Sequence, residues 1–431
     1  MDQTNTTGAG QRQDRRPAET NSPDDEDVSR IAYRVYQDPA IYAAELDRIF
    51  YGPTWNYIGL AAEVPEVGDW RRNMIGEREV LLVRKSEGEF SVLPNVCAHR
   101  GAQICQALRG NAETAFMCPY HQWTYDFEGK LIGVPFRRGV KGKGGMPTDF
   151  EPSNYDLQAL KVAELNGVVF ASYHPDPPAL DDYLGADMKR MFTRVFDGRK
   201  LRIVGKHRQT IDCNWKLQME NLKDPYHAGL LHLFLVTFGL FRLDQKSESF
   251  IGVHGGSAAL VSRRSPPDEH TGNEEIASYA PDYTLEDPTL LQPVMEYDDD
   301  VTLAIQTIFP NIIIQAQSNT LATRHVIPKG VGSHELVWTF FGYEDDDEEM
   351  QKRRLRQANL MGPAGYVTLD DAEALEFSQR GVDCAPPEAV ATLVLGGRDF
   401  ESTDHMVTEA PIRGFHRQYR DAMAKDIINA G

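Results

Sequence analysis

The sequence predicts an α+β protein with two domains: a small all-β domain is followed by a larger domain in which helices cover an antiparallel sheet. The chain has 431 residues, enough to bury a large core and to form two or more domains. Short β runs with turn signals between them fill residues 55–175. In residues 176–431, long β runs are followed by helical stretches, and consecutive strands with segregated helices are typical of an α+β domain.

The first 54 residues precede both domains. Residues 1–27 contain no Val, Leu, Ile or Phe, so they cannot contribute much to a core. We therefore expect a disordered tail over residues 1–29. Residues 30–54 are predicted to form a helical segment that packs on the larger domain.

Three β-hairpins are predicted in the all-β domain. Asn166-Gly167 lies between two β runs and is the strongest hairpin signal, because both residues tolerate the positive φ of a type I′ turn. Similar pairs of β runs flank Glu87-Gly88 and Glu128-Gly129. Residues 142–145 are rich in glycine, but they lack the Ser/Thr and the strand–loop–helix context of a phosphate loop, which favours a flexible turn.

In the larger domain, helical stretches and β runs follow one another without a regular alternation. Asn214 to about His232 has helical character. Long β runs follow at 302–309, 312–317, 321–327 and 335–341, and helical stretches near 347–361, 370–379 and 411–425.

Two Cys–His pairs lie in the all-β domain, Cys97-x-His99 and Cys118-x2-His121. Two thiolates and two imidazoles suit a Rieske [2Fe–2S] cluster, in which the thiolates hold one iron and the imidazoles the other. Cys2His2 is also a zinc set. The interleaving of cysteine and histidine within each pair, with glycine and proline beside them, favours two ligand loops and therefore iron.

Charge and the remaining cysteines bear on partners and compartment. The formal net charge is −19, which disfavours nucleic acid and anionic membranes as partners. No apolar run approaches the roughly 18–20 residues of a membrane span. Cys105, Cys213 and Cys384 form an odd set outside the cluster, and no secretory h-region begins the chain, so a reducing cytoplasm is expected.

The segments Asn95–Gly101 and Cys118–Trp123 resemble the Rieske segment of the large subunit of aromatic-ring-hydroxylating dioxygenases. The resemblance extends from about residue 30 to residue 425. It implies a Rieske domain over residues 55–175 and a mononuclear non-haem iron catalytic domain over residues 176–431. Neither loop carries the extra cysteine of high-potential Rieske proteins, which implies a potential near the low end of about −150 to +300 mV.

His227 and His232 are candidates for a second metal site. Five residues turn a regular helix by about 500°, so the two side chains would not share a face. Joint ligation needs a local distortion, and Gly229 favours one, such as a π-type bulge. Alone, two histidines beside leucines are more often packed core residues.

The surrounding string is similar to the mononuclear-iron segment of the ring hydroxylases. The resemblance implies that His227, His232 and a downstream carboxylate hold Fe(II), with Asp371 favoured over Asp370. Asn221 and Asp224 are the candidate catalytic residues. The resemblance implies that Asp224 bridges a cluster histidine of a neighbouring subunit to an iron histidine. Without the resemblance, the position of Asp224 before Pro225 would favour an aspartate at a helix N-terminus.

An open iron face and a Rieske cluster in one chain indicate reductive activation of O2. The sequence has no nucleotide or flavin fingerprint, so an NADH-dependent reductase, with or without a ferredoxin, is expected as a separate partner. The resemblance implies homotrimers, α3 or, with a small β subunit, α3β3.

The substrate is predicted from the resemblance to salicylate 5-hydroxylases and terephthalate dioxygenases. A carboxylate substrate needs a buried cation, and a planar guanidinium binds it bidentately. Strand alternation places Arg324 with Ala322 and Val326 on an apolar face, where it pairs with a substrate or with an internal carboxylate. Arg413 is the second candidate, although near a helix start it is otherwise an ordinary surface residue.

Four functions follow. The favoured one is ring hydroxylation of an aromatic carboxylate, salicylate to gentisate or a relative such as anthranilate. The others are a terephthalate-type dioxygenase, a Rieske O- or N-demethylase, and an electron carrier with a degenerate second half. The intact set of His227, His232 and Asp371 disfavours the last. Monohydroxylation and cis-dihydroxylation start from the same site, and the sequence favours neither.

Overall fold

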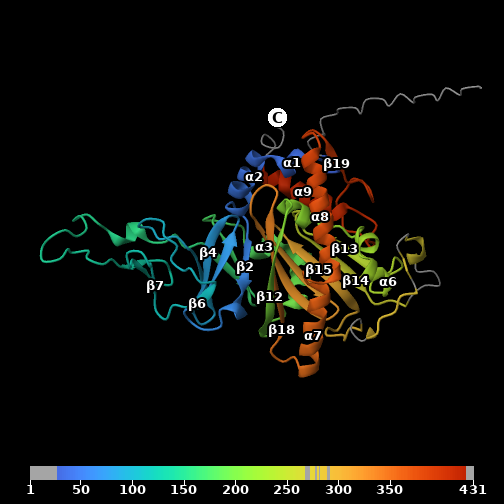
Figure 1. The fold of residues 1–431 in the computed structure, drawn as a ribbon, viewed down its shortest axis with the longest axis horizontal. Helices are drawn as coiled ribbons and strands as arrows, with labels where there is room; N and C mark the ends of the chain where they lie inside the picture. Colours follow the sequence, from blue (N-terminus) through green and yellow to red (C-terminus); the bar gives the residue numbers. More distant parts are fainter. Residues whose placement is uncertain (1–26, 267–271, 277–278, 281, 289–291, 424–431) are drawn as a thin grey trace, which may run out of the picture.

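The fold begins slightly earlier than the sequence suggests. The computed structural model describes residues 27–266, 272–276, 279–280, 282–288 and 292–423 (Figure 1). Residues 1–26 of the expected tail lie outside them. Val28 and Ser29, which we also assigned to the tail, are buried, and Leu393 donates a backbone hydrogen bond to Ser29. Strand β1 (Arg30–Ala32) then pairs with β19 (Val390–Thr392).

The segment after β1 is helical and packs on the larger domain. It contains α1 (Arg34–Gln37), α2 (Pro39–Glu45) and the π-helix η1 (Leu46–Phe50). Asp38 caps α2 through a hydrogen bond from Ala40, and Pro39 occupies the first helical position, where its missing N–H is not needed. Phe50 is fully buried against Trp215, with ring centroids 5.1 Å apart.

Three small antiparallel sheets build the all-β domain, with strand orders β5-β4-β3-β6, β10-β11-β2 and β7-β8-β9. The hairpins form at all three predicted turns, and Asn166 and Gly167 have φ values of 48° and 87°, as a type I′ turn requires. The elements are β2 (Asn56–Leu60), η2 (Ala61–Glu63), β3 (Asp69–Ile75), β4 (Arg78–Ser86), β5 (Glu89–Pro94), β6 (Arg109–Asn111), β7 (Phe116–Met117), β8 (Thr124–Tyr125), β9 (Leu131–Gly133), η3 (Pro152–Tyr155), β10 (Lys161–Leu165) and β11 (Val168–Ser172).

A seven-stranded antiparallel sheet is the centre of the larger domain, in the order β12-β18-β17-β16-β15-β14-β13. The four predicted runs are confirmed as β15 to β18. Strand β12 was not predicted, because it carries charged residues on a half-exposed surface and lacks an apolar run. Strands β13 and β14 were also not predicted; they are only five and six residues long. The strands are β12 (Leu201–Ile211), β13 (Ser247–Ile251), β14 (Ala258–Arg263), β15 (Val301–Ile308), β16 (Ile312–Gln317), β17 (Thr320–Pro328) and β18 (His334–Tyr343).

Helices cover both faces of this sheet, each over its own apolar core. Met188 and Phe192 of α3 pack on one face, and the opposite face lies under α4, α8 and α9. Figure 1 labels α3, α8 and α9 around the sheet. The helices are α3 (Leu180–Val195), α4 (Trp215–Asn221), α5 (Ala228–Leu231), α6 (Leu233–Thr237), η4 (Asn273–Glu275), α7 (Glu348–Met361), α8 (Tyr366–Cys384) and α9 (Ala410–Met423). Among the described residues, none of these helices has both the length and the apolar character of a transmembrane span.

The predicted helix from Asn214 to His232 is wrong as a single element. It ends at Asn221, and Asp224 accepts a hydrogen bond from the Tyr226 amide at 2.9 Å in a turn around Pro225. Proline lacks the N–H that a continuing helix needs and disfavours helical geometry in the residue before it. The expected distortion is therefore a break with short helices on either side of His232, and not a π-type bulge.

A buried charge cluster joins the amino-terminal segment to the catalytic side of the sheet. The Glu45 carboxylate is inaccessible to solvent and accepts from Lys216 Nζ at 2.6 Å, from Tyr419 OH at 2.6 Å and from Trp215 Nε1 at 2.7 Å. These partners lie on α4 and α9. All four polar groups are satisfied, which compensates for their removal from water.

We predict that Glu45→Ala destabilises the protein by about 3–5 kcal/mol, because it leaves the Lys216 ammonium buried without a counter-charge. Urea unfolding followed by tryptophan fluorescence should show a clearly lower midpoint. Glu348→Ala is the matched control, since it removes an exposed carboxylate that pairs with Lys352, and such pairs contribute about 0.5 kcal/mol or less. Equal midpoints for the two variants would contradict the role of Glu45.

Candidate metal centres

Two loops of the all-β domain bring the predicted cluster ligands together, and the loops have the same shape. The Cys97 amide donates to the Ala102 carbonyl and the Cys118 amide to the Trp123 carbonyl, both at 2.8 Å. The fourth residue after each cysteine, Gly101 and Gln122, donates back to the cysteine carbonyl and has a positive φ. Gly101 suits this conformation, whereas the sequence offers no signal for it at Gln122.

The thiols lie inside the domain and the imidazoles near its surface. Cys97 and Cys118 are buried, while His99 and His121 are half-buried with ring centroids 4.6 Å apart. Burial lowers the pKa of His99, which favours the neutral imidazole that binds a metal. His99 Nδ1 is buried without a hydrogen-bond partner. Two inner thiols, two outer imidazoles and an unpaired ring nitrogen fit a Rieske [2Fe–2S] cluster.

Aromatic groups that the sequence analysis did not identify support these loops. The Tyr125 hydroxyl lies 3.3 Å from Cys97 Sγ and accepts from the Ala98 amide at 3.1 Å. Trp123 stacks on His99, with centroids 4.7 Å apart and planes at 9°. The thiol and the imidazole are thus each held by an aromatic side chain of the second loop or the strand that follows it.

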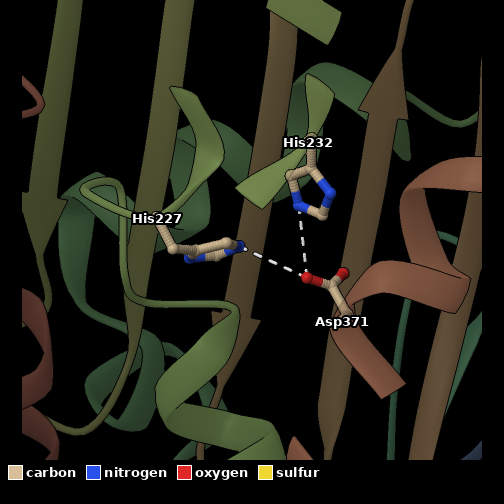
Figure 2. A group of neighbouring side chains, drawn as sticks. All are labelled: His227, His232 and Asp371. Carbon is tan, nitrogen blue, oxygen red and sulfur yellow. Dashed lines mark ion pairs between the residues drawn. The ribbon is translucent and has the colours of Figure 1, made fainter. Parts of the chain in front are cut away.

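The second centre forms where the helix breaks. His227 precedes α5, His232 follows it, and Asp371 comes from α8. Figure 2 shows both imidazoles pointing toward the Asp371 carboxylate, with Oδ1 at 3.3 Å from His227 Nε2 and 3.2 Å from His232 Nε2. The three ligand atoms lie within 4.8 Å of one another. Two histidines and one carboxylate are the donor set of a non-haem Fe(II) site with open positions.

Electrostatics favour a cation among these three side chains. Burial raises the pKa of Asp371, but hydrogen bonds from His227 and His232 outweigh it and hold this pKa well below its usual range. Burial lowers the pKa of His227, but the hydrogen bonds to Asp224 and Asp371 outweigh burial and raise this pKa to about 10. Without a metal, a proton balances the buried carboxylate; a divalent cation supplies the same positive charge.

The neighbouring polar residues orient the ligands. Asn221 Nδ2 donates to Asp371 Oδ1 at 3.1 Å. Asp224 Oδ2 lies 3.3 Å from His227 Nδ1, and Asp370 Oδ2 lies 3.4 Å from His232 Nδ1. Asp370 therefore faces the outer nitrogen of His232, while Asp371 faces the inner nitrogens of both histidines. This geometry favours Asp371 as the ligand and gives Asp370 and Asp224 orienting positions.

Arg324 is buried close to this centre. Its Nη2 donates to Gln315 Oε1, and its guanidinium lies 3.9 Å above the Trp338 ring. Burial lowers the pKa of Arg324 to about 9, and the charge of Asp371 acts in the opposite direction. Arg324 Nε has no hydrogen-bond partner. Within the described part of the chain, no carboxylate lies within 4.0 Å of Arg324, so the structure does not show the alternative internal ion pair.

Arg413 has a different environment. It is fully buried in α9, and Nη1 donates to the carbonyls of Leu393 and Leu395, both at 3.0 Å, while Nε donates to the carbonyl of Asp399. These bonds hold the 393–399 segment against α9. The expectation of a surface residue is wrong, and these contacts indicate a structural role for Arg413. Its Nη2 is buried without a hydrogen-bond partner among the described residues, and the substrate-binding role of Arg413 stays a prediction.

We predict that Asp371→Ala abolishes binding of mononuclear iron but leaves the Rieske absorption spectrum unchanged, because only the second centre loses its carboxylate. Metal analysis of purified protein, with visible spectroscopy, would measure both. Asp370→Ala is the control: it removes an orienting contact, for which a loss of about 10–100-fold in metal affinity is typical. Full iron content in Asp371→Ala would refute the ligand assignment.

Comparison with known proteins agrees with both centres. Residues 196–425 match the ring hydroxylating alpha subunit (catalytic domain) family and residues 54–143 the Rieske [2Fe-2S] domain family. The large oxygenase component of salicylate 5-hydroxylase from Ralstonia sp. is 47% identical over 409 residues, covering 93% of this chain and 96% of the relative. The large subunit of anthranilate 1,2-dioxygenase from Burkholderia cepacia is 43% identical over 401 residues, covering 92% and 94%.

Naphthalene 1,2-dioxygenase from Rhodococcus sp. bound to indole has the same fold, with a TM-score of 0.75 and 26% identity over 91% of this chain and 94% of that chain. The Rieske domain and the catalytic domain, which binds mononuclear iron, are both present. This chain therefore belongs to the Rieske non-haem iron aromatic-ring-hydroxylating oxygenases, as a large, or alpha, subunit.

Proposed function

We propose that this oxygenase hydroxylates the ring of an aromatic carboxylate, with salicylate or anthranilate as the substrate that fits best. The observation that carries the proposal is Arg324, a buried cation beside the iron site without a carboxylate partner among the described residues. The similar proteins named for salicylate and anthranilate support the same chemical class.

The sheet register supports this proposal, because it puts Arg324 on the face of the sheet that packs on α4 and α8. Arg324 on β17 pairs with Trp338 on β18 and with Ile313 on β16, so the three side chains share one face. Ile313 and Trp338 belong to the apolar core that this face forms with α4 and α8. A charged group in such surroundings is costly unless it is paired. A substrate carboxylate would supply both the counter-charge and an acceptor for Nε.

The side chains around the iron then have distinct roles. His227, His232 and Asp371 would hold Fe(II), Asn221 keeps the Asp371 carboxylate in place, and Arg324 would orient the ring by its carboxylate. When both metal groups are bound, the chemistry they supply is activation of O2 with electrons delivered from the Rieske cluster. Those electrons originate from NADH in this proposal and arrive through a separate reductase, with or without a ferredoxin.

The position of Asp224 is consistent with assembly into trimers, which is part of this proposal. Asp224 contacts the outer nitrogen of His227 and lies beside Tyr226, which is exposed. One carboxylate edge therefore orients an iron ligand, and the side chain also lies near the surface, within reach of a cluster histidine from a second copy. The assembly would be a homotrimer, α3, or α3β3 with a small β subunit.

Oxygen consumption across a substrate panel tests the proposed function. The panel contains salicylate, anthranilate, benzoate, the phthalate isomers and naphthalene, with a surrogate NADH reductase system and product analysis. We expect consumption coupled to a ring-hydroxylated product for one carboxylate. A response to naphthalene alone would remove the role of Arg324, and release of formaldehyde from a methylated aromatic would indicate a demethylase.

We predict that Arg324→Gln raises KM for the preferred carboxylate by about 10–100-fold, since hydrogen bonds to charged groups contribute about 1.5–3 kcal/mol. Arg324→Lys should recover part of this loss, because it restores the charge without the planar fork. Arg208→Gln is the control, an exposed arginine of the same sheet, and should leave KM unchanged. An unchanged KM in Arg324→Gln would reject the anchor.

We also predict that Asp224→Asn retains both metal groups but turns over at least about tenfold more slowly, because the orienting charge on His227 is lost. Metal analysis and steady-state rates would be compared with Asp176→Asn, an exposed aspartate outside the metal centres. Turnover close to that of the control would dismiss the bridging role.

A further inference from the structure

A series of packed aromatic rings leads from the cluster loops to the surface of the all-β domain. It starts at the His99 imidazole, which stacks on Trp123. Trp123 then meets Tyr155 edge to face, with ring centroids 5.6 Å apart. Tyr155 is 38% exposed. The protein thus has a continuous packed path from a ligand imidazole to solvent, and electrons tunnel more readily through packed atoms than across open gaps.

A second ring and a cation fix the outer end of this path. Phe150 is buried and stacks on Tyr155 with centroids 4.9 Å apart and planes at 17°. The Arg137 guanidinium lies 5.5 Å from the centre of the Phe150 ring, and its Nη2 donates to the Phe150 carbonyl at 3.0 Å. Stacked rings and a cation over an aromatic face are both stabilising. Tyr155 is therefore held rigidly and connected to the segment that carries Arg137.

That segment, residues 134–149 between β9 and η3, projects from the molecule and is called the arm. Figure 1 shows it in green at the left end, away from the catalytic sheet. Its own backbone orders it, since Val140 donates to Lys143 at 2.9 Å and Met146 donates to Arg137 at 2.9 Å. Phe136 on the arm is 75% exposed. Val140 on the arm is 53% exposed as well, and two large exposed apolar side chains on one projecting segment favour an interaction surface over isolated surface residues.

The charge of this region is opposite to that of the whole chain. Residues 134–149, the arm, contain four Lys and Arg but one Asp and no Glu, whereas the chain has 45 and 64. Glu151 and Asp156 flank Tyr155, so the positive charge lies on the arm itself. Arg138, Lys141 and Lys143 are exposed, and none of them has a carboxylate within 4.0 Å in the described structure. A basic surface on an acidic protein attracts an acidic partner to that place and accelerates its association.

We propose that Tyr155 and the arm form the docking surface for an acidic one-electron carrier protein, which reduces the cluster through Tyr155, Trp123 and His99. The inference rests on the proposed function, which requires a separate donor. In each transfer, the reduced centre of the carrier loses one electron and the cluster gains it. No covalent bond forms or breaks.

Stopped-flow reduction of the full-length, metal-loaded protein tests this surface. The probe is reduced plant-type [2Fe–2S] ferredoxin, an acidic carrier, and dithionite serves as a small donor that needs no docking surface. Arg138→Glu/Lys141→Glu should slow reduction by ferredoxin at least about tenfold at low ionic strength and weaken its dependence on salt. Tyr155→Leu should slow the limiting rate at saturating ferredoxin at least about tenfold, with ferredoxin affinity retained. Reduction by dithionite should stay at the wild-type rate in both.

Arg356→Glu/Lys246→Glu is the matched control, because it makes the same charge change at exposed positions of the catalytic domain. Ferredoxin should reduce this variant at the wild-type rate. Equal slowing in both double variants, wild-type rates in the arm variants, or a wild-type protein that dithionite reduces and ferredoxin does not would each overturn the proposal. A changed oligomeric state of the arm variants on size-exclusion chromatography would instead assign the arm to a contact between copies.

A separate single-turnover measurement tests the proposed function. Dithionite-reduced wild-type protein mixed with salicylate or anthranilate and O2 should give hydroxylated product in a single turnover, without any carrier. Absence of product from every carboxylate would reject the proposed function, while the ferredoxin rates would still decide the docking surface.

Discussion

The buried carboxylate of Asp371 is the group on which the arrangement of the iron site depends. It is removed from water and remains ionised because His227, His232 and Asn221 all direct polar atoms at it. A buried charge of this kind is stable only with positive partners in good geometry. The ligand residues come from two parts of the chain about 140 residues apart, and the second part must be held rigidly against the first.

That rigidity has an identifiable source in the packing of α8 on α4. Gln379 on α8 accepts a hydrogen bond from the backbone amide of Asn214 at 2.8 Å, and the Asn214 side chain caps α4. One side chain of α8 thus fixes the start of the helix that carries Asn221. Beneath α4, Glu45 holds Lys216 and Trp215. The amino-terminal segment therefore stabilises α4, the helix that carries Asn221, although this segment contributes no ligand to the iron site.

Four buried cations, Lys216, Arg413, Lys223 and Arg324, differ in what compensates for their removal from water. Lys216 has a buried carboxylate, and Arg413 has backbone carbonyls. Among the described residues Lys223 has no carboxylate partner, and its Nζ donates only to the Met219 carbonyl at 3.4 Å. Burial lowers the pKa of Lys223 to about 7, so it can lose its charge near neutral pH. Burial lowers the pKa of Arg324 only to about 9, so this side chain is still charged at neutral pH. Arg324 is thus a buried charge on the face of the sheet that packs on α4 and α8, and the carboxylate substrate of the proposed function would balance it.

The sequence by itself determined the class of the cluster centre, because Cys97, His99, Cys118 and His121 lie in two short motifs and local spacing defines them. The iron centre followed only from the resemblance of the segment around His227 and His232 to a known family, because its carboxylate lies far downstream. The sequence also determined strands β15 to β18 and helices α7 to α9, whose periodicity is strong. The resemblance favoured Asp371 over Asp370, and the tertiary structure shows why: neighbouring helix residues point about 100° apart, and Asp371 is the one that faces the inner nitrogens of both histidines. The tertiary structure also showed that Arg324 and Arg413 have different surroundings, and it revealed Tyr125, Trp123 and Tyr155 around the cluster. These roles depend on contacts between residues distant in the chain, which no local pattern records.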